Sequence, residues 1–242
     1  MNRTVALLTV RTLLGRRRAW LLLALPAVLL LLSVVIRLTV GSDEDVTVGL
    51  LGAFALATVV PLLGLIAGTG AIGAEIDDGS IVYLLSKPLS RQTIVTTKLA
   101  VAVAVIAGFA AVPVLVAGFV LSGAADRLAV AYALGALIAG VAYCALFLMV
   151  AVLTRNAVVI GLLYALVWES LVGSFVPGAQ ALSIQQWSLS VTRAVVGPAA
   201  EGLGVTSAVR PAVAVPLLVL LVVGATLAAG RRLRSLRLTG DE

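Results

Sequence analysis

The segment 73-GAEIDDGSIVYLLSKPLSRQTIVTTK-98 interrupts a chain that is otherwise dominated by Leu, Val and Ala. Acidic residues open the segment, a Lys-Pro pair and an Arg follow, and a long apolar run resumes directly after it. An apolar run of about 20 residues is long enough to cross a bilayer as a helix, and such runs stand on both sides. The segment therefore predicts a polar connection between two membrane-spanning helices.

The overall composition is that of a membrane protein. Of the 242 residues, 62% are hydrophobic and 12% are charged, and the mean hydropathy is +1.18, whereas a soluble domain is roughly half apolar and a quarter charged. The net charge of +6 comes with little soluble sequence, so we expect the basic residues to contact the lipid bilayer, and we expect no nucleic acid as a partner.

Two residue types exclude classes of function. The chain has no histidine, which argues against haem-carrying subunits and against zinc or Ser-His membrane proteases. The single cysteine, Cys144, allows no intrachain disulfide, and we expect it to be a small buried residue because it lies within an apolar run. We expect no metal site and no catalytic residue on this chain.

Six apolar runs have about the length of a membrane span. We therefore expect an all-α, polytopic membrane protein with six transmembrane helices in a single domain over residues 1–242. The runs are Trp20 to Val40, Val46 to Ile72, Ile94 to Leu121, Leu128 to Leu153, Ala157 to Val176 and Val213 to Ala229.

Two segments outside these runs predict shorter helices. Residues 1–19 carry a basic amphipathic pattern that predicts an N-terminal helix in the membrane interface, the alternative being a disordered basic stub. Residues 177–212 are too polar to span a membrane and too apolar for a free loop. We expect short helices at the outer surface there, with Trp187 as an interfacial anchor; they either seal the bundle or cap a pathway.

The positions of Lys and Arg predict the orientation, because cytoplasmic loops carry the excess of positive charge. With the N-terminus inside, thirteen of the 17 Lys and Arg residues fall on the cytoplasmic side and four on the other, where the acidic turn at 41–45 also lies. An even number of spans then places both termini in the cytoplasm. The cytoplasmic set is Arg3, Arg11, Arg16, Arg17, Arg18, Lys87, Arg91, Lys98, Arg155, Arg231, Arg232, Arg234 and Arg237.

The connection at 74–92 has the pattern of a short amphipathic helix. Apolar residues between 81 and 85 share one side, acids precede them and Lys87 follows, in keeping with the helix dipole. Pro88 ends this helix or follows its end. Ser90 can cap the next helix, with Arg91 and Lys98 facing headgroups before the third span. This connection suits a docking element in the cytoplasm.

The same segment resembles the cytoplasmic signature of the permeases of type-2 ABC exporters. That signature has an acid, a Gly-Thr or Gly-Ser, a Leu-Leu, a Lys/Arg-Pro-hydrophobe-Ser-Arg run and a downstream Lys. The matching residues are Glu75, Asp78, Gly79, Ser80, Ile81, Leu84, Leu85, Ser86, Lys87, Pro88, Leu89, Ser90, Arg91 and Lys98. The one departure is Ser80, where Thr is more usual, and this exchange keeps the hydroxyl.

The resemblance implies that residues 74–92 form a coupling helix, which fits into a cleft on a separate ATPase (nucleotide-binding) subunit. It implies a transporter of two permeases, either two copies or this chain with a related one, and two ATPases, with ATP and Mg²⁺ on the ATPases. The residues that it assigns to ATPase coupling are Glu75, Asp78, Gly79, Leu84, Leu85, Lys87, Pro88 and Arg91. It also implies the cytoplasmic membrane of a prokaryote, and export as the direction.

Glu169 is the one clearly intramembrane acid. At 1.5 Å per residue it lies about 20 Å beyond Arg155, in the outer half of the predicted fifth span. A carboxylate in lipid is costly and by default marks a functional site. We therefore consider a role in the pathway or outer gate, beside the alternative of a structural hydrogen bond to the neighbouring outer helices, for example to a loop amide, to Arg193 or to Arg210.

Small residues also mark faces for close helix packing. Gly64 and Gly68 in the second span, and Gly135 and Ala139 in the fourth, recur at a spacing of four.

The chain is not expected to hydrolyse ATP itself, because neither Lys87 nor Lys98 follows a glycine as in a P-loop. The leading function is therefore a permease subunit of an ATP-driven exporter. The alternatives are a non-transporting sensor or assembly component and an ion-driven secondary transporter, although the chain lacks the repeats expected of the latter. The few polar groups in the spans favour a hydrophobic or amphipathic substrate, such as a drug, a lipid or a peptide.

Overall fold

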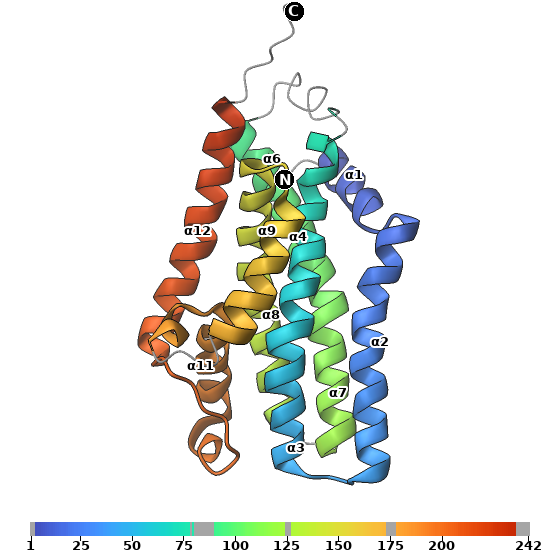
Figure 1. The fold of residues 1–242 in the computed structure, drawn as a ribbon, viewed down its shortest axis with the longest axis vertical. Coiled ribbons are helices and arrows are strands. Elements are labelled where there is room, and N and C mark those ends of the chain that lie inside the picture. Colours follow the sequence, from blue (N-terminus) through green and yellow to red (C-terminus); the bar gives the residue numbers. More distant parts are fainter. Residues whose placement is uncertain (1–2, 78, 80–89, 124–126, 173–177, 236–242) are drawn as a thin grey trace, which may run out of the picture.

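The protein is a helical bundle in which the long helices run side by side (Figure 1). The structure is a computed structural model that describes residues 3–77, 79, 90–123, 127–172 and 178–235. Every regular element among these residues is a helix. The prediction of an all-α fold is thereby confirmed.

Five helices are long and apolar enough to cross a membrane, because a hydrocarbon core of about 30 Å needs about 20 helical residues. Three of these spans are single α-helices, α2, α8 and α12. The second and third predicted spans are each interrupted by a π-helical stretch. The bounds are α2 Arg16–Thr39; α3 Glu44–Gly49, η1 Leu50–Val59 and α4 Val60–Asp77; α6 Arg91–Ile106, η2 Ala107–Ala111 and α7 Val112–Ser122; α8 Arg127–Leu153; and α12 Pro211–Ser235.

The predicted fifth span is shorter in the structure. Helix α9 (Ala157–Leu163) continues into the π-helix η3 (Tyr164–Val172), and its apolar part ends at Glu169. Residues 173–177 lie outside the described part of the chain. Five of the six predicted runs thus contain a helix with the length and composition of a span, and a sixth crossing stays a prediction.

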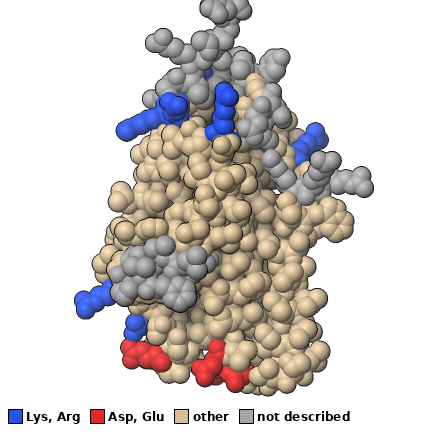
Figure 2. All heavy atoms as spheres, viewed as in Figure 1, with Lys and Arg blue, Asp and Glu red and all other residues tan. Residues whose placement is uncertain are grey.

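Charge separates the two ends of the bundle. Arg91, at the start of α6, and Arg232, near the end of α12, lie at the end where α1 (Arg3–Leu13) begins. Figure 2 shows Lys and Arg at this end and Asp and Glu at the other, with further Lys or Arg side chains at the lower left, toward the acidic end. We call these the basic end and the acidic end.

Capping side chains begin α3, α6 and α11, the last through Ser183, whose hydroxyl oxygen accepts a hydrogen bond from the Gln186 N–H (3.3 Å). Asp43 Oδ1 accepts hydrogen bonds from the N–H groups of Asp45 (2.9 Å) and Val46 (3.2 Å) at the start of α3. The Ser90 Oγ accepts a hydrogen bond from the Thr93 N–H (3.1 Å) at the start of α6, so the predicted cap at Ser90 is confirmed.

Helix α1 packs against α4 and α6. Its buried side chains, Val5, Thr9 and Leu13, follow each other at a spacing of four, and the Thr9 hydroxyl donates to the Val5 carbonyl oxygen (2.8 Å). Leu7, Leu8, Val10 and Leu14 are exposed. The helix therefore has one face on the bundle and an apolar face for lipid.

Residues 178–210 contain three short helical elements, η4 (Ala179–Leu182), α11 (Ile184–Val196) and η5 (Gly197–Ala200). Helix α11 packs against α8 and α12. The prediction that Trp187 anchors this region at the headgroups was wrong. Its side chain is buried and its Nε1–H donates to the Ala181 carbonyl oxygen (2.7 Å), so its single polar group is used inside the protein.

Helices α4 and α8 pack closely, and two of the predicted small residues, Gly64 and Gly68 of α4, lie at this contact. A β-carbon on Gly64 would lie 2.6 Å from the Tyr143 Cβ, and one on Gly68 would lie 2.9 Å from the Cys144 carbonyl oxygen. Cys144 is fully buried, as expected. Because backbone atoms of α8 cannot move aside cheaply, these glycines set the distance between the two helices.

Replacing Gly68 with Ala is expected to lower the free energy of unfolding in detergent by about 1–3 kcal/mol, because overpacking forces the helices apart. Gly224→Ala is the matched control: it lies within α12, and a β-carbon there meets nothing within 4 Å. Thermal unfolding followed by circular dichroism measures both variants. Equal midpoints for the two variants would contradict the proposed packing.

Candidate functional site

The two helices that flank the predicted coupling segment, α4 and α6, end and begin at the basic end (Figure 1). Glu75, Gly79 and Arg91 are described by the structure. Gly79 has a φ of +68°, and its N–H donates to the Ile76 carbonyl oxygen (3.2 Å). A glycine in this left-handed conformation commonly terminates a helix. Arg91 is half-buried at the first position of α6. Asp78, Leu84, Leu85, Lys87 and Pro88 lie outside the described residues.

An ion pair joins the two helices that flank this segment. The Lys98 Nζ of α6 lies 2.6 Å from the Glu75 Oε1 of α4, and it also donates to the Ala71 carbonyl oxygen (2.7 Å). The Lys98 side chain is 0% exposed and that of Glu75 is 19% exposed. The ammonium therefore has a carboxylate and a carbonyl as partners, both from α4.

The expectation that Lys98 faces headgroups was wrong. The buried face of α6 includes Ile94, Lys98 and Ala102 at a spacing of four, so the helical period itself places Lys98 among core residues. A lysine is buried only when its charge is compensated, and Glu75 supplies the compensation. The period was the signal in the sequence that could have located this pair.

A second contact fixes the start of α6 from another side, and sequence reasoning missed it. The Gln92 Nε2 donates to the Thr226 carbonyl oxygen of α12 (3.2 Å). A β-carbon on Gly230 of α12 would collide with the Gln92 side chain. The start of α6 is thus fastened both to α4 and to α12. Neither Gln92 nor Gly230 belongs to a sequence pattern that would have predicted this contact.

Glu169, at the other half of the bundle, is fully buried. Its carboxylate accepts hydrogen bonds from the Ser183 hydroxyl, the Ile184 N–H (3.0 Å), the Gln185 N–H (3.5 Å) and the Tyr164 hydroxyl (3.1 Å). The two N–H groups belong to the first turn of α11, where an anion compensates the helix dipole. This arrangement agrees with the structural alternative of a hydrogen bond to the neighbouring outer helices, here α11.

The alternative partner Arg193 is engaged elsewhere. Its Nη2 lies 2.6 Å from the Glu201 Oε1, and both side chains are substantially exposed. Exposed ion pairs of this kind contribute little to stability. Glu169 is therefore compensated by hydrogen-bond donors rather than by Arg193.

The surroundings of Glu169 are unusual in their backbone. Glu169 lies within the π-helix η3, and the Gln185 Nε2 of α11 donates to the Gly52 carbonyl oxygen (3.3 Å) of the π-helix η1. π-Helical turns are rare and occur frequently at functional sites. Glu169 and Gln185 together join α11 to two such segments, whereas a role of Glu169 in a pathway stays a prediction.

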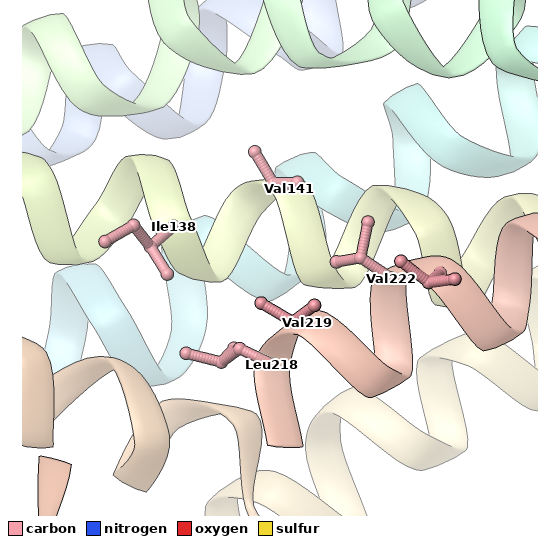
Figure 3. A pocket seen from close by; sticks show the side chains of 6 residues that line it. Ile138, Val141, Leu218, Val219 and Val222 are labelled. Carbon is pink, nitrogen blue, oxygen red and sulfur yellow. The ribbon is translucent and has the colours of Figure 1, made fainter. Parts of the chain in front are cut away.

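A wholly apolar groove lies between α8 and α12. Figure 3 shows Ile138 and Val141 of α8 opposite Leu218, Val219 and Val222 of α12. With Val223, these six residues enclose about 280 Å³. No lining side chain has a hydrogen-bonding group, so the groove can hold only hydrocarbon.

No group of three or more His, Cys, Asp or Glu residues that could hold a metal ion occurs within the described part of the chain. The polar features there are the Glu75–Lys98 pair, the Glu169 cluster and the basic end.

These features define a class: an all-helical polytopic membrane protein whose two ends differ in charge. The chain belongs to the ABC-2 family transporter proteins, whose family model matches residues 5–192, more than three quarters of its length. This match confirms the resemblance to an ABC-2 type permease, the membrane component of an ABC transporter. A search of curated proteins finds no match.

Breaking the ion pair with Lys98→Met is expected to lower the free energy of unfolding by about 3–5 kcal/mol, because the Glu75 carboxylate loses its partner. Combining it with Glu75→Leu is expected to restore most of that stability, since a neutral apolar pair carries no uncompensated charge. A double-mutant cycle from thermal unfolding in detergent measures the coupling. Additive effects of the two changes would contradict a direct interaction.

Replacing Glu169 with Gln is expected to loosen the start of α11, because an amide offers one acceptor oxygen in place of two and brings its own donors. The backbone amides of Ile184 and Gln185 should then exchange hydrogen for deuterium at least tenfold faster. Glu201→Gln, an exposed acid of the same region, is the control and should leave exchange at these amides unchanged. Unaltered exchange in Glu169→Gln would show that this carboxylate does not hold α11.

Proposed function

We propose that this protein is the permease subunit of an ATP-driven exporter, driven by a separate ATPase subunit that binds ATP and Mg²⁺. The observation that carries the proposal is the family match over residues 5–192. We further propose that residues 74–92 are the coupling segment, which binds a cleft of the ATPase.

The Glu75–Lys98 pair supports a mechanism for this coupling. Along the chain, residues 78–90 are connected to α4 on one side and to α6 on the other, so a force on the segment would act on these two helices. The pair connects these two helices, since the Lys98 Nζ lies 2.6 Å from the Glu75 Oε1. The Gln92 side chain connects α6 to α12 by its hydrogen bond. A movement of the segment would therefore displace three helices together instead of bending one connection.

The mechanism changes the proposed role of Glu75. In this account Glu75 is a positioning residue, because its carboxylate lies against Lys98 of the same chain. Arg91, together with Leu84, Leu85 and Lys87, is proposed to contact the ATPase directly. Asp78, Gly79 and Pro88 would shape the ends of the coupling helix.

The orientation in the membrane follows as part of the proposal. The gathering of Lys and Arg at one end of the bundle (Figure 2) supports that end as the cytoplasmic side. Both termini are then cytoplasmic, and α9 with η3 forms the fifth of six spans, in the cytoplasmic membrane of a prokaryote. The Glu169 cluster lies toward the outer surface, where we propose that it holds α11 as part of an outer gate.

A hydrophobic or amphipathic cargo fits the bundle best. The groove between α8 and α12 offers only aliphatic side chains, and desolvating a polar molecule against them would be unfavourable. The pathway is proposed to form where two permeases meet, with a second copy of this chain or a related permease as the other half.

The test is purification of the tagged full chain from its native cells, with an associated P-loop ATPase identified by mass spectrometry. The Leu84→Glu and Arg91→Glu variants are expected to lose this ATPase, or to reduce its stimulated ATP hydrolysis to the rate of the ATPase alone. Arg231→Glu, an exposed arginine on α12 at the same end, is the matched control and should keep both. Survival of the complex and its activity in both coupling variants would contradict the proposal.

A further inference from the structure

One buried hydroxyl group has no role in the contacts described so far. Within the described part of the chain, the Tyr143 side chain of α8 is fully buried, and its hydroxyl has no hydrogen-bond partner. A buried donor that is left without a partner is unfavourable, and most buried polar groups in native proteins have one. The Tyr143 hydroxyl therefore calls for a second arrangement of the protein in which it is used.

Packing holds the Tyr143 ring beside the Glu169 cluster. The ring stacks on that of Phe147 (centroids 6.0 Å apart), and Phe147 meets the Tyr164 ring edge-on (6.0 Å). On its other side, the Tyr143 Cβ lies against α4 at Gly64, where a β-carbon would come within 2.6 Å of it. The hydroxyl lies near the Glu169 carboxylate and near the start of α11, without a hydrogen bond to either.

The carboxylate of Glu169 has no acceptor site left for Tyr143 in the present arrangement. Two carboxylate oxygens offer about four lone-pair sites, and Glu169 already accepts from four donors. The Tyr164 hydroxyl is the donor from η3 itself, whereas the other three come from the cap and first turn of α11. If α11 moved away, three sites would fall empty on a carboxylate in an apolar bundle, which is costly. The donors from α11 are Ser183, Ile184 and Gln185.

We propose that Tyr143 is a positioning residue for Glu169, whose hydroxyl donates to the carboxylate when α11 moves away from it. The hydroxyl is unpartnered while α11 is docked and becomes partnered when α11 leaves, so it brings the two arrangements closer in free energy. Without this second donor, the buried carboxylate would hold α11 permanently. The inference rests on the proposed role of α11 in an outer gate, and it supplies the means by which that gate opens.

The experiment is hydrogen–deuterium exchange on the purified full chain in detergent, read at the backbone amides of Ile184 and Gln185. The variant Tyr143→Phe removes a hydroxyl that is unpaired in the docked arrangement and needed in the other one. Opening of α11 should therefore become rarer, and these amides should exchange on the order of tenfold more slowly than in the natural chain. Tyr132→Phe is the matched control on the same helix and should leave the exchange unchanged, because its hydroxyl lies toward Gly52 of η1.

The direction of the change decides the outcome. Faster exchange in Tyr143→Phe would show that the hydroxyl supports the docked arrangement, and unchanged exchange would show that it has no role in opening; either result overturns the inference. In a Glu169→Leu background the effect of Tyr143→Phe should disappear, and its persistence would overturn the assignment to Glu169. If Glu169→Leu fails to fold, the sign in the single variant decides.

The exchange measurement needs no ATPase, so its outcome is separate from the test of the proposed function. Slower exchange in Tyr143→Phe supports the inference even if the natural chain retains no ATPase. An intact ATPase complex together with unslowed exchange overturns the role of Tyr143 alone.

Discussion

The cost of leaving a polar group without a partner in hydrocarbon governs this structure. Helices satisfy their backbone groups internally, which is why all the described elements are helices. Hydroxyl side chains within the bundle follow the same rule by donating to their own helix. Ser33 donates to the Leu29 carbonyl oxygen (2.8 Å), and Thr69 donates to that of Leu65 (2.6 Å).

Two charged side chains are buried in the described core, Lys98 and Glu169, and both connect helices that are distant in sequence. Lys98 reaches α4 through Glu75, and Glu169 reaches α11 through backbone N–H groups and the Ser183 hydroxyl. Each charge is costly without its partner, so each fixes the relative position of two elements. One fixed position lies at the α4 and α6 ends beside the proposed coupling segment, and the other lies at the start of α11.

Much of the fold could be predicted from local signals. The apolar runs predicted five helices of spanning length among the described residues, and Ser90 predicted the start of α6. Gly64 and Gly68, at a spacing of four, indicated the close approach of α4 and α8. The coupling signature also identified the family before any tertiary contact was known, and the family match confirms it. These features depend on neighbouring residues only, so a single sequence contains them.

The pairings between distant residues could not be predicted in this way. Lys98 was expected at the headgroups because basic residues usually flank a span, but its partner stands 23 positions earlier in another helix. Trp187 was expected to be an interfacial anchor, yet its Nε1–H donates to the Ala181 carbonyl oxygen within residues 178–210. In both cases the tertiary partner, and not the residue type, decides whether the side chain is buried.

The central claim is that residues 74–92 bind an ATPase and transmit its movement to the bundle. A photo-crosslinking amino acid at position 84, in the full chain expressed with its ATPase in native membranes, tests this claim most directly. The account predicts a crosslink from position 84 to the ATPase and none from the same probe at Leu220, an exposed position on α12. Crosslinks from position 84 only within this chain or to lipid would contradict the account.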